Sequence, residues 1–173
     1  SVQTASRKDT LMRRFIKKFV NQLPSNGSVV RMTEDKGNIY ITKSDGKSDT
    51  FPCVVAHMDT VHDIHKSFIV YENVYTRCFF AMNEANTQVG IGGDDKVGIY
   101  IALQALKTMH NIKIVFFRDE EIGCIGSGDA DMKFFSDCRF VLQCDRRGNN
   151  EVITNGSSTG LMSKEFQEDI KGF

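Results

Sequence analysis

Residues 90–98 read G-I-G-G-D-D-K-V-G and place two adjacent carboxylates directly before an apolar segment with helical spacing. Glycines let the backbone approach a ligand closely, so these acids can face a charged group. We therefore hypothesise that Asp94 bridges two divalent metal ions. The alternative is a solvated acidic turn that caps a helix over residues 96–109, because aspartate is common before helices. The remaining motifs of the sequence are needed to choose between a metal ligand and a capping turn.

The composition is that of one globular domain, which we expect to span residues 1–173. The chain has 173 residues, of which 40% are hydrophobic, and only two prolines, so it can bury a core. The formal net charge is zero and no basic stripe interleaves with aromatic residues, so no nucleic-acid partner is predicted. No apolar run approaches the ~20 residues that span a bilayer. The first residues also lack the pattern of a secretion signal, so no membrane partner is expected.

The cysteines favour a reducing compartment. They are odd in number and form no C-x-x-C pair, which argues against a disulfide scaffold or a cysteine zinc site. We predict a cytoplasmic protein in which most of these side chains are small buried apolar groups. The five are Cys53, Cys78, Cys124, Cys138 and Cys144.

Helix and strand patterns alternate along the chain, which is typical of an α/β fold with helices on both faces of a mixed sheet. The first expected helix is capped by Asp9 and buries a stripe of Leu11, Met12, Phe15, Ile16, Phe19, Val20 and Leu23. The expected strands are a hairpin at 29–33 and 39–42, apolar strands at 51–56, 112–117 and 139–144, one or two strands within 67–82, and one at 151–155. Further helices are expected at 96–109, around 129–135, and from 163 to 170.

Three of the apolar strands end in residues that bind metals. His57 and Asp59 follow the first, Glu120 and Glu121 the second, and Asp145 the third. In open α/β sheets, ligands gather outside the carboxyl ends of the strands, so these residues are expected to converge there. Imidazole and carboxylates together suit zinc, and carboxylates alone can hold manganese or magnesium.

The local spacing predicts how these residues divide the work. Side chains alternate along a strand, so His57 and Asp59 should point to the same side. Asp59 can then accept the second ring N–H of His57 and fix its orientation. The adjacent Glu120 and Glu121 should point to opposite sides, so that one binds metal and the other takes a proton from a water that the metal acidifies. This arrangement is that of a hydrolase.

The blocks H-M-D-T-V (57–61), G-G-D-D-K-V-G (92–98), D-E-E-I-G (119–123) and C-D (144–145) give the chain a family resemblance. In order and approximate spacing they are similar to those of the co-catalytic zinc exopeptidases, and most like the tripeptidase branch, peptidase T. The resemblance covers roughly residues 9–155. It implies a three-layer α/β fold and a metal-dependent aminopeptidase that removes the N-terminal residue of a short peptide.

The resemblance also implies a role for each site residue. Two divalent ions are expected, zinc before manganese or cobalt. His57, Asp94 and Asp145 would hold one ion, and Asp94 and Glu121 the second; Glu120 would be the general base and Asp59 the orienting acid. The peptide bond after the bridging aspartate is often cis in such enzymes, which makes the bond between residues 94 and 95 a candidate.

The chain departs from the family in two ways. The family completes its second metal site with a distant downstream histidine, whereas the other histidines here are His62, His65 and His110. The lid or dimerisation domain of larger relatives is also missing. We therefore expect either a fragment, incomplete at its carboxyl end, or a reduced protein with one good metal site. A truncated sheet would expose an edge strand, through which the chain can form a homo-oligomer.

Two rival functions stay open at this point. One is an N-acyl amino acid deacylase that uses the same site. The other is a metal-binding interaction module that has lost catalysis, which the absent histidine favours and the presence of Glu120 disfavours.

Overall fold

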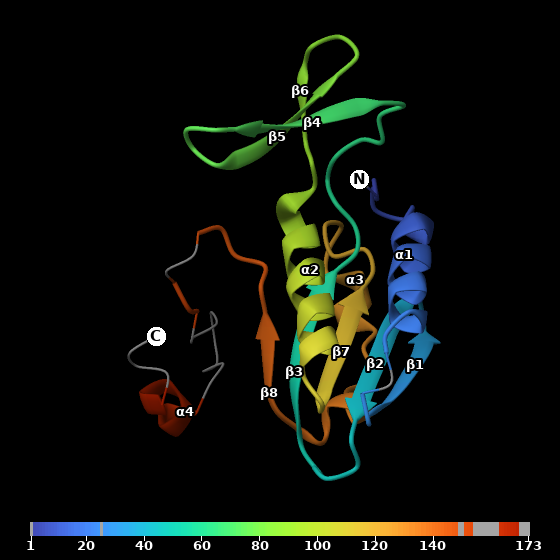
Figure 1. The fold of residues 1–173 in the computed structure, drawn as a ribbon, viewed down its shortest axis with the longest axis vertical. Helices are drawn as coiled ribbons and strands as arrows, with labels where there is room; N and C mark the ends of the chain where they lie inside the picture. The colour runs from blue at the N-terminus through green and yellow to red at the C-terminus, as the bar shows by residue number, and fades with distance from the viewer. Residues whose placement is uncertain (1, 25, 149–150, 154–162, 170–173) are drawn as a thin grey trace.

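The computed structural model describes residues 2–24, 26–148, 151–153 and 163–169. Figure 1 shows an upright mixed sheet with two long helices in front of it and a smaller sheet beyond its upper end. The mixed α/β fold expected from the sequence is confirmed. Within the described ranges, no helix has the length and apolar character needed to cross a membrane.

The main sheet has five strands in the order β1-β2-β7-β3-β8. The β1/β2 hairpin, predicted from the sequence, is antiparallel, and β2 is also antiparallel to β7. The three strands β7, β3 and β8 are parallel, so their carboxyl ends lie at the same end of the sheet. The strand bounds are β1 Val29–Asp35, β2 Asn38–Ser44, β3 Phe51–His57, β7 Ile112–Phe117 and β8 Cys138–Gln143.

The helices are unequal in length. The two long ones, α1 and α2, pack side by side on one face of the main sheet (Figure 1), whereas two short pieces and a terminal helix follow β7 and β8. The helix expected around residues 129–135 is the short 3-10 helix η1, and a further one-turn helix, α3, precedes it. The bounds are α1 Thr10–Asn21, α2 Gly93–Thr108, α3 Ile125–Gly128, η1 Met132–Phe135 and α4 Lys164–Asp169.

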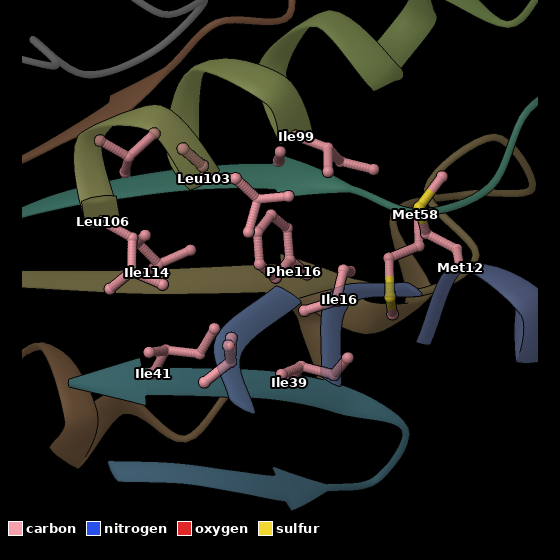
Figure 2. Close-up of a cluster of buried hydrophobic side chains, with 14 of the residues drawn as sticks. Met12, Ile16, Ile39, Ile41, Met58, Ile99, Leu103, Leu106, Ile114 and Phe116 are labelled. Atoms are coloured by element: carbon pink, nitrogen blue, oxygen red, sulfur yellow. The ribbon is translucent and has the colours of Figure 1, made fainter. Parts of the chain in front are cut away.

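The principal core lies between the sheet and the two long helices, as Figure 2 shows. Alternate residues of the central strands point into it, as expected from the two-residue repeat of a strand. Phe116 at its centre is fully buried. The other members that Figure 2 labels are Met12 and Ile16 of α1, Ile39 and Ile41 of β2, Ile114 of β7, Met58 after β3, and Ile99, Leu103 and Leu106 of α2.

A smaller core lies on the opposite face of the same sheet. There Tyr40, Val55 and Val115 pack against Phe134 and Phe135 of η1. The ring of Tyr40 meets that of Phe134 edge-on at a centroid distance of 5.0 Å. Both faces of the sheet therefore carry apolar side chains, and both are covered in part by helical residues.

The first helix differs from its prediction in two respects. Met12, Ile16 and Val20 are buried, and Phe19 and Leu23 pack half-buried against the core. Leu11 and Phe15 of the expected stripe are instead 54% and 44% exposed. Asp9 stands at the cap position, but its carboxylate accepts from Arg13 Nε at 2.9 Å instead of capping the helix.

Residues 67–82 form two strands that join a separate antiparallel sheet. Its strands are β4 Phe68–Asn73, β5 Cys78–Asn83 and β6 Gln88–Val89. Apolar side chains such as Ile69, Val70 and Tyr71 are exposed on it. The sequence predicted these strands but not that they would leave the main sheet.

Two expectations about the later chain need correction. Residues 151–153 form no strand, and residues 154–155 of that expected strand lie outside the described ranges. Among the cysteines only Cys53 is buried, while Cys78 and Cys124 are exposed. The strand β8 lies at one edge of the main sheet, and its Val141 is 49% exposed.

Candidate metal centre

The parallel arrangement of β3, β7 and β8 brings the predicted site residues to one end of the sheet. His57 is the last residue of β3, the turn after β7 carries Glu120 and Glu121, and Asp145 follows β8 by two residues. Helix α2 also begins at this end (Figure 1), so Asp94 joins them. The convergence expected from strand ends is therefore present in the structure.

His57 lies at the centre of this cluster. Its Nε2 atom is 2.9 Å from Asp94 Oδ1, 3.7 Å from Asp145 Oδ2 and 3.8 Å from Glu120 Oε2. The imidazole is only 1% exposed, whereas the Asp94 side chain is 66% exposed. One buried nitrogen thus faces three carboxylates that open toward solvent.

The potential ligand atoms form two sets, and within each set all atoms lie within 4.8 Å of one another. One set is His57, Asp94 and Glu121, and the other is His57, Asp95 and Asp145. All four residues expected to bind metal belong to one set or the other. The sets do not reproduce the division into two ion sites that the family resemblance implies, so that division stays a prediction.

The adjacent acids Asp94 and Asp95 are joined by a cis peptide bond and have separate surroundings. Asp95 is buried, and its carboxylate accepts from the backbone N–H groups of His57 at 3.1 Å and Gly98 at 2.9 Å. Asp94 and Asp95 have non-helical dihedral angles, so the regular part of α2 begins after Asp95, and a side chain that accepts the N–H three residues later caps it. The capping alternative therefore describes Asp95, in a buried form, while Asp94 faces His57.

Asp59 lies behind His57 as the two-residue spacing predicts. Its Oδ1 atom is 3.4 Å from His57 Nδ1, a distance longer than an ordinary hydrogen bond. The same carboxylate accepts from the backbone N–H groups of Glu120 at 2.9 Å and Glu121 at 3.3 Å. Asp59 therefore ties the end of β3 to the turn after β7.

Glu120 and Glu121 do not point to opposite sides, contrary to the expectation. They follow β7 in a tight turn, so the alternation of a strand no longer applies to them. Glu120 reaches His57 and accepts from Cys124 Sγ at 3.4 Å. Glu121 accepts from the backbone N–H of Val61 at 3.2 Å and also lies in the cluster.

Burial and crowding shift the proton equilibria of the cluster. Burial alone would lower the pKa of His57, but Asp59, Asp95 and Asp145 outweigh it and raise that pKa to about 9. Burial raises the pKa of Asp95 to about 7, against its two backbone hydrogen bonds. Burial would raise the pKa of Asp59, but His57, Ser6 and the Glu120 N–H together outweigh it and lower that pKa to about 2.

The remaining acids are also crowded. Burial raises the pKa of Glu121, and the charge of Asp94 raises it further. Burial also raises the pKa of Asp145, and Asp94 adds to that shift, against the opposing charge of His57. Like charges held this close resist ionisation unless a cation joins them.

The residues present fit a divalent ion. Imidazole nitrogen and carboxylate oxygen are the donors of catalytic zinc sites, and a cation would relieve the repulsion among the acids. His57 Nδ1 is buried without a hydrogen-bond partner among the described residues, and metal binding through Nε2 would strengthen its attraction to Asp59.

No second histidine joins the cluster within the described parts of the chain. The His62 ring lies against Gly90, the His65 backbone bonds to Gln3, and His110 Nδ1 is 3.4 Å from Ser28 Oγ. None of the three belongs to either set of ligand atoms. The second site predicted from Asp94 and Glu121 therefore gains no histidine from these residues.

Sequence reasoning missed two residues of this region. Asp95 was visible only as the second acid of a pair, and nothing in the sequence separates its role from that of Asp94. Ser6 donates to Asp59 Oδ2 at 2.6 Å from a position 53 residues away. No spacing rule connects those two positions.

Comparisons with known proteins support the fold. No protein-family model matches the chain, and no curated protein matches it. A tripeptidase from Staphylococcus aureus has a TM-score of 0.64 and 17% identity, over 84% of this chain and 40% of its own. A proposed aminohydrolase from methicillin-resistant Staphylococcus aureus has a TM-score of 0.49 and 16% identity, over 82% of this chain and 35% of its own.

This chain thus spans less than half the length of either structure. At these identities the likeness to the tripeptidase concerns the fold, which is the same mixed α/β arrangement.

Proposed function

We propose that this chain carries the metal centre of a metal-dependent aminopeptidase that removes the N-terminal residue of short peptides. The observation that carries the proposal is the cluster around His57, where a buried imidazole meets Asp94, Asp145 and Glu120 within 4 Å. Three strand ends and a helix start contribute to it. An acidic turn that served only to cap α2 would not need the residues from the other elements.

In this proposal His57, Asp94 and Asp145 hold one divalent ion, and Asp94 and Glu121 contribute to a second. Zinc suits this mixture of nitrogen and oxygen donors, with manganese or cobalt as alternatives. When bound, such ions polarise the peptide carbonyl and lower the pKa of water. The first ion has three protein ligands and the second only two among the described residues, so the first should bind more tightly.

Glu120 is the general base. Its side chain is 29% exposed, so it can reach water and still lies beside His57. Glu120 accepts a proton from the attacking water as the water oxygen bonds to the carbonyl carbon. The carbon–nitrogen bond then breaks, and Glu120 returns the proton to the leaving amine. Water is consumed, and a free amino acid and a shortened peptide are released.

Asp59 and Asp95 hold His57 in place from two directions. Asp59 attracts the Nδ1 side of the ring, and Asp95 accepts from the His57 backbone N–H. These contacts leave Nε2 facing the acids, which is the orientation a metal ligand requires. Positioning of this kind matters because small displacements of a catalytic group reduce its effect strongly.

The experiment is a substrate panel. The zinc-loaded protein is incubated with matched dipeptides and tripeptides that have either a free or an acetylated amino terminus, and released amino acids and released acetate are both measured. We expect release from the free-amine peptides, abolished by a chelator and restored by zinc. Cleavage of the acylated set alone would contradict the aminopeptidase and identify a deacylase. No cleavage of either set, with zinc bound, would favour the interaction module.

A further inference from the structure

The segment before α1 crosses the end of the sheet next to the proposed metal centre. The carbonyl of Thr4 accepts from the Thr60 backbone N–H at 2.7 Å and from Thr60 Oγ1 at 3.1 Å. Ala5 forms a parallel β-bridge with Thr60. Residues 4–5 are thus hydrogen-bonded to the loop that follows His57.

Ser6, the next residue, reaches the proposed site itself. Its hydroxyl donates to Asp59 Oδ2 at 2.6 Å, and Asp59 is fully buried. The other donor to this oxygen is the Glu121 backbone N–H at the longer distance of 3.3 Å. Ser6 therefore provides the shorter of the two contacts that hold Oδ2.

The same segment holds the turn that carries the two glutamates. The Arg7 backbone N–H donates to Asp119 Oδ1 at 2.6 Å. Asp119 has a positive φ of 50° and directly precedes Glu120. Residues 4–7 therefore fasten the loop after β3, which carries Asp59, to the turn after β7, which carries the two glutamates.

We propose that Ser6 is a positioning residue for the metal centre, acting through Asp59 on His57. The inference rests on the proposed function only in taking His57 as a metal ligand. With the hydroxyl present, Asp59 has a short contact on each oxygen and keeps Oδ1 beside the His57 ring. Without the hydroxyl, Oδ2 keeps only the longer contact from the Glu121 N–H, so the carboxylate that orients the ring is held less firmly.

Removal of a group that supports a metal ligand typically weakens metal affinity by about 10–100-fold. Ser6 is one step further away, because it acts on Asp59, which acts on His57. We therefore expect an effect at the lower end, roughly tenfold. Threonine has the same hydroxyl and should restore most of the affinity.

The test uses Co²⁺ alone, titrated into the metal-free full chain and followed by visible absorption. Ser6→Ala should bind its tightest cobalt ion roughly tenfold more weakly, with an altered spectrum. Ser6→Thr should bind it nearly as tightly as the parent. Ser136→Ala is the matched control, because the Ser136 hydroxyl donates one hydrogen bond, to the Lys133 carbonyl at 2.9 Å, at the end of η1.

The outcomes separate this inference from the proposed function. If the parent binds cobalt and Ser6→Ala binds it equally well with the same spectrum, the role of Ser6 is contradicted and the metal centre is not. If the parent binds no cobalt, the metal centre is contradicted, and the role of Ser6 with it. Should Ser6→Ala fail to fold, Ser6→Val is compared with Ser6→Thr, which has nearly the same shape and keeps the hydroxyl, and equal cobalt affinity in these two variants overturns the inference.

Discussion

At the scale of single residues, the neighbouring acids of the glycine-rich turn have different tasks. Asp95 is buried and bonded to two backbone N–H groups, whereas Asp94 is largely exposed and faces His57 Nε2. The sequence predicted Asp94 as the ligand, and it also offered helix capping as the alternative. The structure assigns helix capping to Asp95, and metal binding by Asp94 stays a prediction. Burial, which decides between them, depends on contacts that the sequence does not display.

Glu120 is the residue whose replacement should separate catalysis from metal binding. Glu120→Gln keeps the size of the side chain but cannot accept the proton. Because general-base catalysis contributes about 10²–10⁴-fold, we expect peptide hydrolysis to fall by at least about 100-fold with bound zinc unchanged. Both quantities are measured on the same preparation.

The matched control for that variant is Glu72→Gln. Glu72 pairs with Arg77 at 3.1 Å in the small sheet, away from the cluster, so its loss should leave hydrolysis at the parent rate. Equal rates for Glu120→Gln and the parent would mean that another group takes the proton.

At the scale of secondary structure, the start of α2 is set by the contact between Gly98 and Asp95. A Cβ atom on Gly98 would lie 2.2 Å from Asp95 Oδ1 and 2.6 Å from Oδ2. The close approach of this carboxylate to the helix therefore requires glycine at position 98. Any side chain there would displace Asp95 from the N–H groups of His57 and Gly98, from which it accepts hydrogen bonds.

Gly98→Ala should therefore destabilise the metal-free protein by about 1–3 kcal/mol, as overpacking in a core does. The free energy of unfolding in urea measures it. Gly128→Ala is the control, because a Cβ atom there meets nothing within 4 Å, and its stability should stay within about 0.5 kcal/mol of the parent. A Gly98→Ala protein as stable as the control would show that Asp95 moves aside without cost.

Most elements could be predicted because their apolar patterns are strong. The strands β3 and β7 are apolar apart from His57 and Lys113, are almost entirely buried, and lie within a residue of their expected bounds. The small sheet was harder, since β4 has a strand pattern that does not reveal which sheet it joins. Leu11 and Phe15 were misassigned because helical spacing gives the direction of a stripe and not the width that the sheet covers.

At the scale of the whole molecule, the strand order of the main sheet brings the residues of the candidate metal centre together. Parallel pairing of β7, β3 and β8 brings residues from 57 to 145 to one end of the sheet, as the rule for ligand sites in open α/β sheets predicts. That convergence could be derived from the sequence, because each strand ended in polar residues. The contact of Ser6 could not, because it depends on where the chain enters α1 relative to the loop after β3.

The most direct test of the account is the zinc content of the dialysed protein, compared with that of Asp94→Asn. We predict about one tightly held zinc ion per chain, because one site has three protein ligands, and a second ion only at higher zinc concentration. Asp94→Asn should lose the tight ion. Asp45→Asn should keep it, because Asp45 caps a turn after β2 through the Lys47 N–H. A parent protein without zinc, or an Asp94→Asn protein with as much zinc as the parent, would contradict the metal centre.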